Sequence, residues 1–449
     1  MDKLSEDLWK LLKLDGVYLE HQTIFTANAM ARQSIWRENK GYANFDLYTD
    51  NSEYKPGNKG HKLDYNKCSD YNNNFLTTYI GKIVDSVLNQ DNDELIDEEL
   101  LRFNTMRSQA LTFNLFGEFV SQDNYKIKDE YQAIVNETFK NLFPELEINE
   151  ITHIKFEYSP DRGEEKYTDD GTAFDVFVKF KNIDCENGFI GIEVKYSENM
   201  IDSDTYYKYH EKIYENIFGI MKAKKIFNKD ISNSEDSNPK DLWEGNTQNK
   251  IEQTWRNHML TMSLLASVQG ARKDEKNYNY PEENSFKDGL FVILYPEKNE
   301  ECQEVIEHYQ SKLNKSKKTY FKAVIMEEFV KELEKVTLDN FIKDLESKSS
   351  NQKILGISRI GTSLFPQDKK WIKDFKNRYL NLSEIQKLDE QLKKIASKNY
   401  NQPDCKQALI FPTDCKQALI FSKSNNNWVA WCREDHRACI LRKCRNYNT

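Results

Sequence analysis

Three segments in the middle of the chain alternate between apolar and polar residues. The alternation runs over residues 151–158, 173–180 and 189–196, and turn-rich stretches separate the three segments. A period of two residues predicts β-strands, because successive side chains of a strand point to opposite faces of the sheet. Apolar residues recur at helical spacing after this region, over residues 249–269, and this pattern predicts a helix there.

Further helices are predicted at 25–39, 107–120 and 129–143, and two short apolar runs at 289–296 and 319–326 predict additional strands. The order in the middle of the chain is therefore helix, three strands, helix, strand. This order indicates a mixed α/β fold around a mostly three-stranded antiparallel core, with helical additions at both ends.

Changes of pattern predict four regions along the chain. They are an N-terminal helical and loop region (1–104), the α/β domain (105–345), a Lys-rich helical region (346–400) and a tail (401–449). In the tail the octapeptide DCKQALIF occurs twice, ten residues apart. Two short copies do not make a solenoid, which needs longer units and at least three of them. We expect this repeat-containing tail to be poorly ordered.

The composition of the chain bears on where the protein acts and what it binds. The chain has 449 residues with 64 basic and 73 acidic side chains, a formal net charge of -9. No apolar run is long enough for a membrane span, and the N-terminus lacks the apolar stretch of a signal peptide, so we expect a soluble cytoplasmic protein without membrane contact. Net acidity argues against non-specific adhesion to nucleic acid, and any polyanionic partner must therefore meet a local basic surface.

The alternation also sorts the side chains of the three strands onto two faces. The apolar residues expected on one face are Ile154, Phe156, Tyr158, Phe174, Val176, Val178, Phe180, Ile190, Ile192, Val194 and Tyr196. The opposite face carries Asp175 on the second strand and Glu193 and Lys195 on the third. Two carboxylates on neighbouring strands repel one another, and a cation between them would relieve this repulsion. Hard oxygen ligands suit Mg²⁺.

A lysine two residues after the second carboxylate would lie on the same face, within reach of a metal-bound water and a phosphate. It could orient or help deprotonate the water, or stabilise charge on phosphorus. The alternative is a solvated sheet face whose charged groups make weak cross-strand pairs. The pattern acid-any-Lys is common in this chain, but only Glu193-Val-Lys195 lies on an apolar-alternating segment that follows a strand with an aspartate.

Asp175 and Glu193-Val-Lys195, in this order of elements, resemble the PD-(D/E)XK nuclease superfamily, whose fold many restriction endonucleases share. The resemblance covers about residues 105 to 300 and implies a restriction-endonuclease-like core. It also implies that Asp175 and Glu193 bind metal and that Lys195 orients or activates water. One departure is that no proline precedes Asp175, a feature that many members of this divergent superfamily also lack.

Three further segments, Ser108 to Phe116, Glu157 to Pro160 and Gln253 to His258, look like an uncharacterised bacterial group of restriction-endonuclease-like proteins. The resemblance implies two auxiliary residues, Glu118 as a further metal carboxylate from the helix before the strands and Gln253 near the active site.

Each of these assignments has an alternative. Glu118 would share an ordinary solvated helix face with Arg107 and Asn114, and Gln253 would be a surface amide. Glu157 is a fourth acid or a member of a strand-end pair. His258 is assigned no catalytic role.

The resemblance therefore implies a Mg²⁺-dependent endonuclease, with Mn²⁺ as a substitute, that cleaves double-stranded DNA in restriction or defence. Cutting both strands generally takes two active sites, so a homodimer is plausible, whereas a partner methyltransferase cannot be read from the sequence. One alternative is a catalytically silent nucleic-acid-binding or partner-binding module on a nuclease scaffold. Another is a nuclease for RNA or branched DNA.

Overall fold

The computed structural model describes residues 23–42, 62–64, 70–89, 96–160, 167, 171–198, 200, 226–227, 252–266, 285–348, 366–381, 418–422, 428–432 and 437–440. The chain forms two compact units. The core unit contains Phe75–Leu101 and Arg107–Lys376, and the terminal unit contains Met1–Asn74, Arg102–Met106 and Asn377–Thr449. All residues of the candidate site belong to the core unit.

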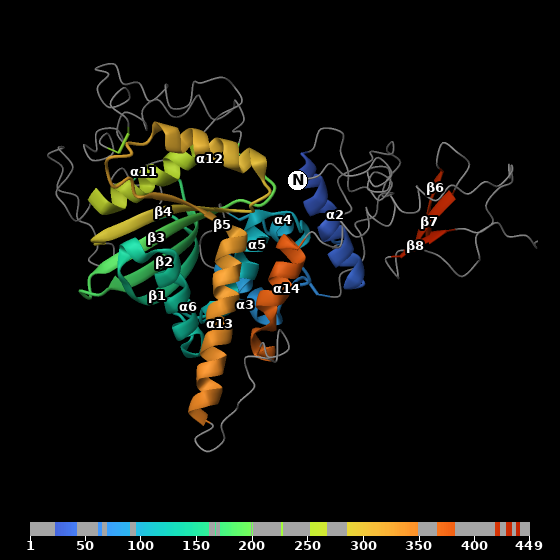
Figure 1. Cartoon of the computed structure of the whole chain (residues 1–449), viewed down its shortest axis with the longest axis horizontal. Coiled ribbons are helices and arrows are strands. Elements are labelled where there is room, and N and C mark those ends of the chain that lie inside the picture. The colour runs from blue at the N-terminus through green and yellow to red at the C-terminus, as the bar shows by residue number, and fades with distance from the viewer. Residues whose placement is uncertain are drawn as a thin grey trace, which may run out of the picture. The chain divides into compact units, whose positions relative to one another are not determined.

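The core unit is built on a five-stranded sheet in the order β1-β2-β3-β4-β5 (Figure 1). The strands are β1 (Ile148–Tyr158), β2 (Phe174–Asn182), β3 (Asn187–Val194), β4 (Asp288–Tyr295) and β5 (Phe321–Ile325). β2 is antiparallel to both β1 and β3, whereas β4 runs parallel to β3 and β5 runs parallel to β4. The predicted α/β class with a three-stranded antiparallel core is confirmed.

Helices cover both faces of this sheet (Figure 1). The helices α11 (Glu252–Ala266) and α12 (Glu300–Lys312) lie on one face, and α5 (Ser108–Phe116), α6 (Asp129–Leu142) and α13 (Met326–Lys348) lie on the other. Because both faces are covered, seven of the eight residues of β3 are buried in a continuous run. Within the part of the chain that the structure describes, no helix is long and apolar enough to cross a membrane.

Shorter elements complete the core unit. They are α3 (Thr78–Leu88), α4 (Glu98–Phe103, which ends in the terminal unit), α14 (Lys370–Phe375), the 3₁₀ turns Gly117–Phe119, Pro144–Leu146 and Gln367–Lys369, and a π-helical turn (Lys376–Leu380) that continues into the terminal unit. The longer helices follow the sequence pattern. In α6 the buried residues Tyr131, Ile134, Val135, Thr138 and Phe139 recur at the spacing of one helix face.

The predicted alternation of β1 breaks at Glu157, which adopts a left-handed backbone conformation with φ of 47°. Phe156 stacks on Phe113 of α5, with ring centroids 4.5 Å apart, whereas Tyr158 stacks on Phe177 with centroids 4.3 Å apart. The prediction that Phe156 and Tyr158 share a face was therefore wrong. A positive φ rotates the chain out of the regular pleat, so the residues on either side no longer follow period two.

The predicted face of Phe174 on β2 is also wrong. Its ring stacks with that of Phe177, at 5.8 Å between centroids, and lies against Gly191 of β3. A Cβ atom at Gly191 would lie 2.4 Å from the Phe174 ring, so this close approach requires glycine. The α11 side of the sheet is therefore an aromatic core rather than a solvated polar face.

The terminal unit contains α2 (Ile24–Asn39), close to the predicted helix at 25–39. Arg378 is fully buried there. Its guanidinium donates to Oε1 of Gln33 at 3.0 Å and to the carbonyl of Asn74 at 2.6 Å, and it lies 3.5 Å from the ring centroid of Trp36.

The tail, predicted to be poorly ordered, contributes three short antiparallel strands, β6 (Ala418–Ser422), β7 (Trp428–Cys432) and β8 (Arg437–Ile440). The first copy of the octapeptide and the beginning of the second lie outside the described residues.

Candidate active site

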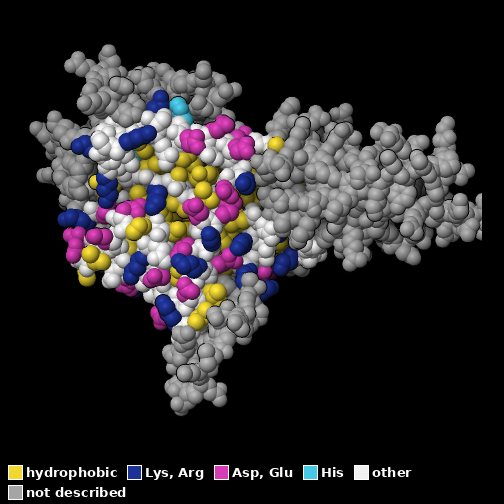
Figure 2. Space-filling model, viewed as in Figure 1, with side chains coloured by type: hydrophobic (Ala, Val, Ile, Leu, Met, Phe, Trp, Pro, Cys, Tyr) yellow, Lys and Arg dark blue, Asp and Glu magenta, His cyan; other side chains and the backbone are white. Residues whose placement is uncertain are grey.

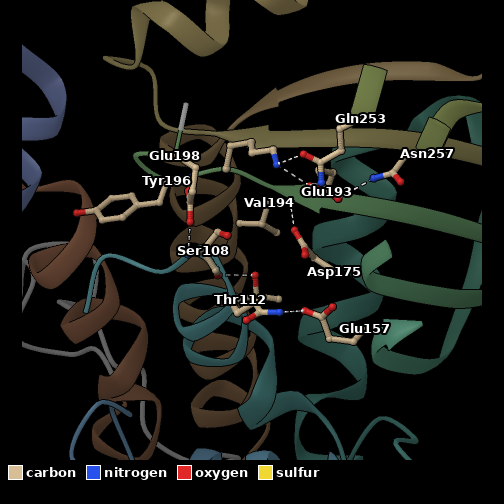
Figure 3. Close-up of polar contacts among 12 residues, drawn as sticks. Ser108, Thr112, Glu157, Asp175, Glu193, Val194, Tyr196, Glu198, Gln253 and Asn257 are labelled. Atoms are coloured by element: carbon tan, nitrogen blue, oxygen red, sulfur yellow. Dashed lines mark hydrogen bonds and ion pairs between the residues drawn. The ribbon is translucent and has the colours of Figure 1, made fainter. Parts of the chain in front are cut away.

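Asp175 lies where β2 and β3 separate. The last backbone pair between these strands is Val176 with Ile192. Beyond it, the backbone N–H of Val194 donates to Oδ2 of Asp175 at 2.7 Å (Figure 3). The carboxylate thus satisfies a strand amide that has no partner on β2, and it is fixed at the opening between the two strands.

Glu193 is held by two amides of α11. Nε2 of Gln253 donates to Oε1 of Glu193, and Nδ2 of Asn257 donates to Oε2, both at 2.7 Å (Figure 3). The two amides are four residues apart on one helix, so they face the same direction. Glu193 is only 3% exposed, and α11 therefore determines the orientation of a buried carboxylate.

Lys195 completes this network. Its Nζ forms an ion pair with Oε1 of Glu193 at 2.7 Å and donates to Oε1 of Gln253 at 2.7 Å. Its backbone N–H donates to the carbonyl of Leu294 on β4, which fixes the chain just beyond β3. Burial alone would lower the pKa of this lysine, but Glu193 and Asp175 raise it above its usual range. The side chain is therefore held as an ammonium group.

Glu157 is the third acid of the cluster. It lies between two β1 residues that pair with Val176 and Phe174, so it is the cross-strand neighbour of Asp175. Its Oε1 accepts a hydrogen bond from Nε2 of Gln109 on α5 at 3.0 Å. Burial, and then the charge of Glu193, raise the pKa of Glu157 to about 8. Glu157 therefore lies within electrostatic reach of Asp175 and Glu193, and its carboxylate accepts from Gln109 rather than from a strand-end lysine.

Among the described residues, the cluster is short of positive charge. Three carboxylates with one lysine leave two negative charges when all are ionised, and burial together with Glu193 and Glu157 raises the pKa of Asp175 well above its usual range. Oδ1 of Asp175 accepts no hydrogen bond from the described residues. A free oxygen on a half-buried carboxylate with unbalanced charge fits a hard divalent cation.

A complete metal cage is not preformed. Among the residues that the structure describes, no three His, Cys, Asp or Glu side chains stand ready to hold an ion together. Both oxygens of Glu193 are engaged by Lys195, Gln253 and Asn257. The residues present fit a cation by their chemistry, and metal binding would exchange some of these hydrogen bonds.

Glu198 links the end of β3 to α5. Its Oε1 accepts from the backbone N–H of Ser108 at 2.6 Å, and its Oε2 accepts from that of Tyr196 at 3.0 Å (Figure 3). A carboxylate at the first turn of a helix satisfies an N–H that has no partner within the helix. Glu198 thus fixes α5, which carries Gln109, relative to the segment that carries Lys195.

Glu118 is placed differently. The predicted helix 107–120 ends at Phe116, and the following 3₁₀ turn carries Glu118. Its carboxylate accepts a hydrogen bond from the hydroxyl of Thr77, and Nζ of Lys128 lies 3.5 Å away. The charged groups that act on the pKa values of Asp175, Glu157 and Lys195 do not include Glu118.

The solvated helix face considered for Glu118 and Asn114 was wrong. Glu118 is 8% exposed and Asn114 is fully buried, with its Oδ1 accepting from the backbone N–H of Leu76 at 2.7 Å. Both residues connect this helix to the segment before α3.

His258, next to Asn257, has both ring nitrogens engaged. Nδ1 lies 2.6 Å from the hydroxyl of Tyr309 on α12, and Nε2 lies 2.6 Å from the carbonyl of Thr319. Burial lowers the pKa of His258 to about 3, so the ring is neutral. These contacts anchor α11 beside the sheet, in agreement with the expectation that His258 has no catalytic role.

A family model of the PD-(D/E)XK nuclease superfamily matches residues 20–381, more than three quarters of the chain. The chain belongs to the PD-(D/E)XK nuclease superfamily. Members of this superfamily are generally nucleases and usually use divalent metal ions. Searches of curated proteins and of solved structures gave no significant match.

Of the site residues predicted for this superfamily member, the structure brings together Asp175, Glu193, Lys195 and Gln253. It adds Asn257, for which no role was predicted. The signal for Asn257 was its position four residues after Gln253. Gln109 and Glu198 left no such signal, because they act through contacts between elements far apart in the sequence.

Proposed function

We propose that this protein is a Mg²⁺-dependent endonuclease that hydrolyses phosphodiester bonds of DNA in the cytoplasm, in restriction or defence. The observation that carries the proposal is the meeting of Asp175, Glu193 and Lys195 at the opening between β2 and β3, where the buried Glu193 and Lys195 form an ion pair and the half-buried Asp175 accepts from the backbone N–H of Val194. A cluster of buried acids with unbalanced charge lowers stability, and such clusters are typical of functional sites.

Asp175 and Glu193 are the residues that we assign to metal binding, with Glu157 as a further nearby acid. When bound, the ion would neutralise charge and activate water for attack on phosphorus. Mg²⁺ fits best because the donors are carboxylate oxygens, and it typically takes one or two of them and keeps several waters. Mn²⁺ prefers the same oxygen ligands and is the expected substitute.

Lys195 and Gln253 act beside the acids. The ammonium group of Lys195 lies 2.7 Å from an oxygen of Glu193, so it adjoins the position that a bound ion would occupy. From there it would orient the attacking water and stabilise the charge that develops on phosphorus. Gln253 accepts from Lys195 and donates to Glu193, so it holds the ammonium group and the carboxylate next to each other.

Double-stranded DNA is the substrate that we propose, by analogy with the restriction endonucleases of this superfamily. One chain supplies one such cluster, and cutting both strands would use two chains, so we propose a homodimer for cleavage. No observation adds a methyltransferase partner.

The test is incubation of the purified full chain with supercoiled plasmid, with and without Mg²⁺, beside the Glu193→Ala and Lys195→Ala variants. We expect nicked and linear DNA only with Mg²⁺, and a loss of about 100-fold or more in each variant. Cleavage unchanged by either substitution would contradict the site. DNA retention without strand breaks at any divalent metal would favour the silent binding module, and cleavage of only RNA or branched DNA would correct the substrate.

A further inference from the structure

Three lysines surround His153 on the outer part of the sheet. His153 of β1 pairs with Lys179 of β2 on one side and with Lys126 on the other, where residues 125–127 add a short segment to the edge of β1. Directly opposed residues in a sheet point to the same face. Lys155 lies two residues after His153 on the same strand and carries its ammonium group 5.0 Å from the ring centroid of Tyr158.

The described charged groups that act on His153 are all positive. Apart from burial, the groups that lower the pKa of His153, to about 4, are Lys179, Lys155 and Lys126. No carboxylate of the described residues is among them. Lys126 is exposed and Lys155 is half-buried, and neither forms an ion pair or a hydrogen bond with a described acid.

This cluster is unusual for a chain with a net charge of -9. On the face drawn in Figure 2, basic and acidic side chains of the described residues are interspersed, as on an ordinary protein surface. Three ammonium groups at neighbouring positions of the sheet give this part of the molecule a locally positive potential. The lysine cluster therefore provides the local basic surface that a net acidic protein needs to hold a polyanion.

The lysine cluster lies on the same two strands as the acids of the site. Lys155 is two residues before Glu157 on β1, and Lys179 is four residues after Asp175 on β2. At about 3.3 Å per residue these separations are about 7 Å and about 13 Å along the strands. One DNA strand carries a phosphate about every 3.4 Å of helix axis, so the cluster and the acids would lie within the length of a few nucleotides.

We infer that Lys126, Lys155 and Lys179 form the surface that holds the phosphate backbone of the DNA substrate beside the active site. The inference rests on the proposed nuclease function and assigns its substrate-binding surface. The contacts are electrostatic and independent of base sequence, because ammonium groups on a sheet surface neutralise phosphates without reading base edges.

The experiment measures binding separately from cleavage. A fluorescent DNA duplex is titrated with the full chain in EDTA at several salt concentrations between about 50 and 200 mM, where phosphate contacts change affinity strongly. The triple variant Lys126→Ala, Lys155→Ala, Lys179→Ala is compared with a control that loses the same charge, Lys315→Ala, Lys317→Ala, Lys331→Ala. The three control lysines are exposed and lie outside the cluster.

We expect the cluster variant to bind at least about 10-fold more weakly than the wild type, and its salt dependence to lose a slope of about 3, close to one unit for each phosphate contact removed. The control should keep the wild-type slope. Single Lys155→Glu replaces the triple variant if circular dichroism shows that the triple variant is not folded.

Equal slopes in the cluster variant and the wild type would overturn the inference, as would a wild type that does not retain duplex at low salt. A wild type that binds through the cluster but does not cleave with Mg²⁺ would support the surface and contradict the proposed nuclease function.

Discussion

Among the described residues of the core unit, glutamate is buried in two places, and its charge is balanced in one of them but not in the other. In the active-site cluster, Asp175, Glu157 and Glu193 share one lysine, and the pKa values of Asp175 and Glu157 are raised. Around Glu118, the carboxylate accepts from Thr77 and pairs with Lys128, which also forms an ion pair with the exposed Glu130 at 3.6 Å.

Two aromatic rings contact the lysine that pairs with Glu118. Nζ of Lys128 lies 3.9 Å from the ring centroid of Tyr79 and 4.9 Å from that of Tyr131. The lysine is therefore stabilised by a carboxylate and by two π faces together. Nothing in this arrangement calls for another cation.

Burial of an acid is therefore a weak sign of function, whereas burial of acids without enough positive charge to balance them is a strong one. A compensated buried charge contributes to packing, and removing one partner destabilises the fold. An uncompensated cluster costs stability, which protonation of the acids or a bound cation offsets.

The Asp175→Asn variant should separate activity from stability. The amide oxygen can still accept from the N–H of Val194, while one negative charge of the cluster disappears. We expect plasmid cleavage to fall by about 100-fold or more and the urea unfolding midpoint of the metal-free protein to rise, because repulsion with Glu193 and Glu157 is relieved.

Asp288→Asn is the matched control for this substitution. Asp288 begins β4 of the same sheet, and its charge is compensated by Lys318 at 2.7 Å. Its removal should leave cleavage unchanged and should not raise the midpoint. A stable and fully active Asp175→Asn protein would show that the uncompensated cluster has no catalytic role.

The fold was predictable because its strands and helices have strong local patterns. The five strands and the helices α2, α6 and α11 lie within a few residues of the predicted ranges. The faces on which Tyr158 and Phe174 lie differ from those predicted, and this difference was not predictable. Period two assumes an unbroken pleat, and the positive φ of Glu157 and the contact of Phe174 with Gly191 both depend on tertiary packing.

The candidate site was predictable as far as its residues lie on adjacent strands or on one helix face. Asp175, Glu193 and Lys195 follow from strand pairing, and Gln253 came from the family resemblance. Gln109 and Glu198 were not predictable, because their contacts join residues far apart in the sequence. Gln109 lies 48 residues before its partner Glu157, and Glu198 lies 90 residues after its partner Ser108. The burial of Glu118 was missed because it depends on Thr77, 41 residues earlier in the chain.

Stability of the metal-free protein should fall as pH rises from about 6.5 to 8. In this window the folded state keeps a proton on Glu157, with a pKa of about 8, that the unfolded state has released at its ordinary value of 4.5. The folded state therefore binds more protons, and the free energy of unfolding decreases with pH. The effect is at most about 2 kcal/mol for one group over this range.

Histidines oppose this decrease near the lower limit of the window. His153, His258 and His308 have lowered pKa values, so the unfolded state still binds part of their protons at pH 6.5, and each raises stability by at most about 0.4 kcal/mol over the window. Urea unfolding in EDTA at both ends of the window therefore compares the wild type with Glu157→Gln, and the wild type should lose more stability. An equal change in the two proteins would contradict the pKa assigned to Glu157. Mg²⁺ should restore stability at the upper end, because bound metal favours the ionised acids.

Glu118→Gln should have the smallest effect on stability and activity, and it tests whether Glu118 binds metal. The amide oxygen can still accept from Thr77, but the ion pair with Lys128 is lost, so we expect a loss of about 1 kcal/mol in the free energy of unfolding. Cleavage per folded molecule and the Mg²⁺ concentration for half-maximal cleavage should match the wild type. A large increase in that Mg²⁺ concentration would instead establish Glu118 as the metal carboxylate that the sequence resemblance implied, and would show that a compensated buried acid can also serve the metal.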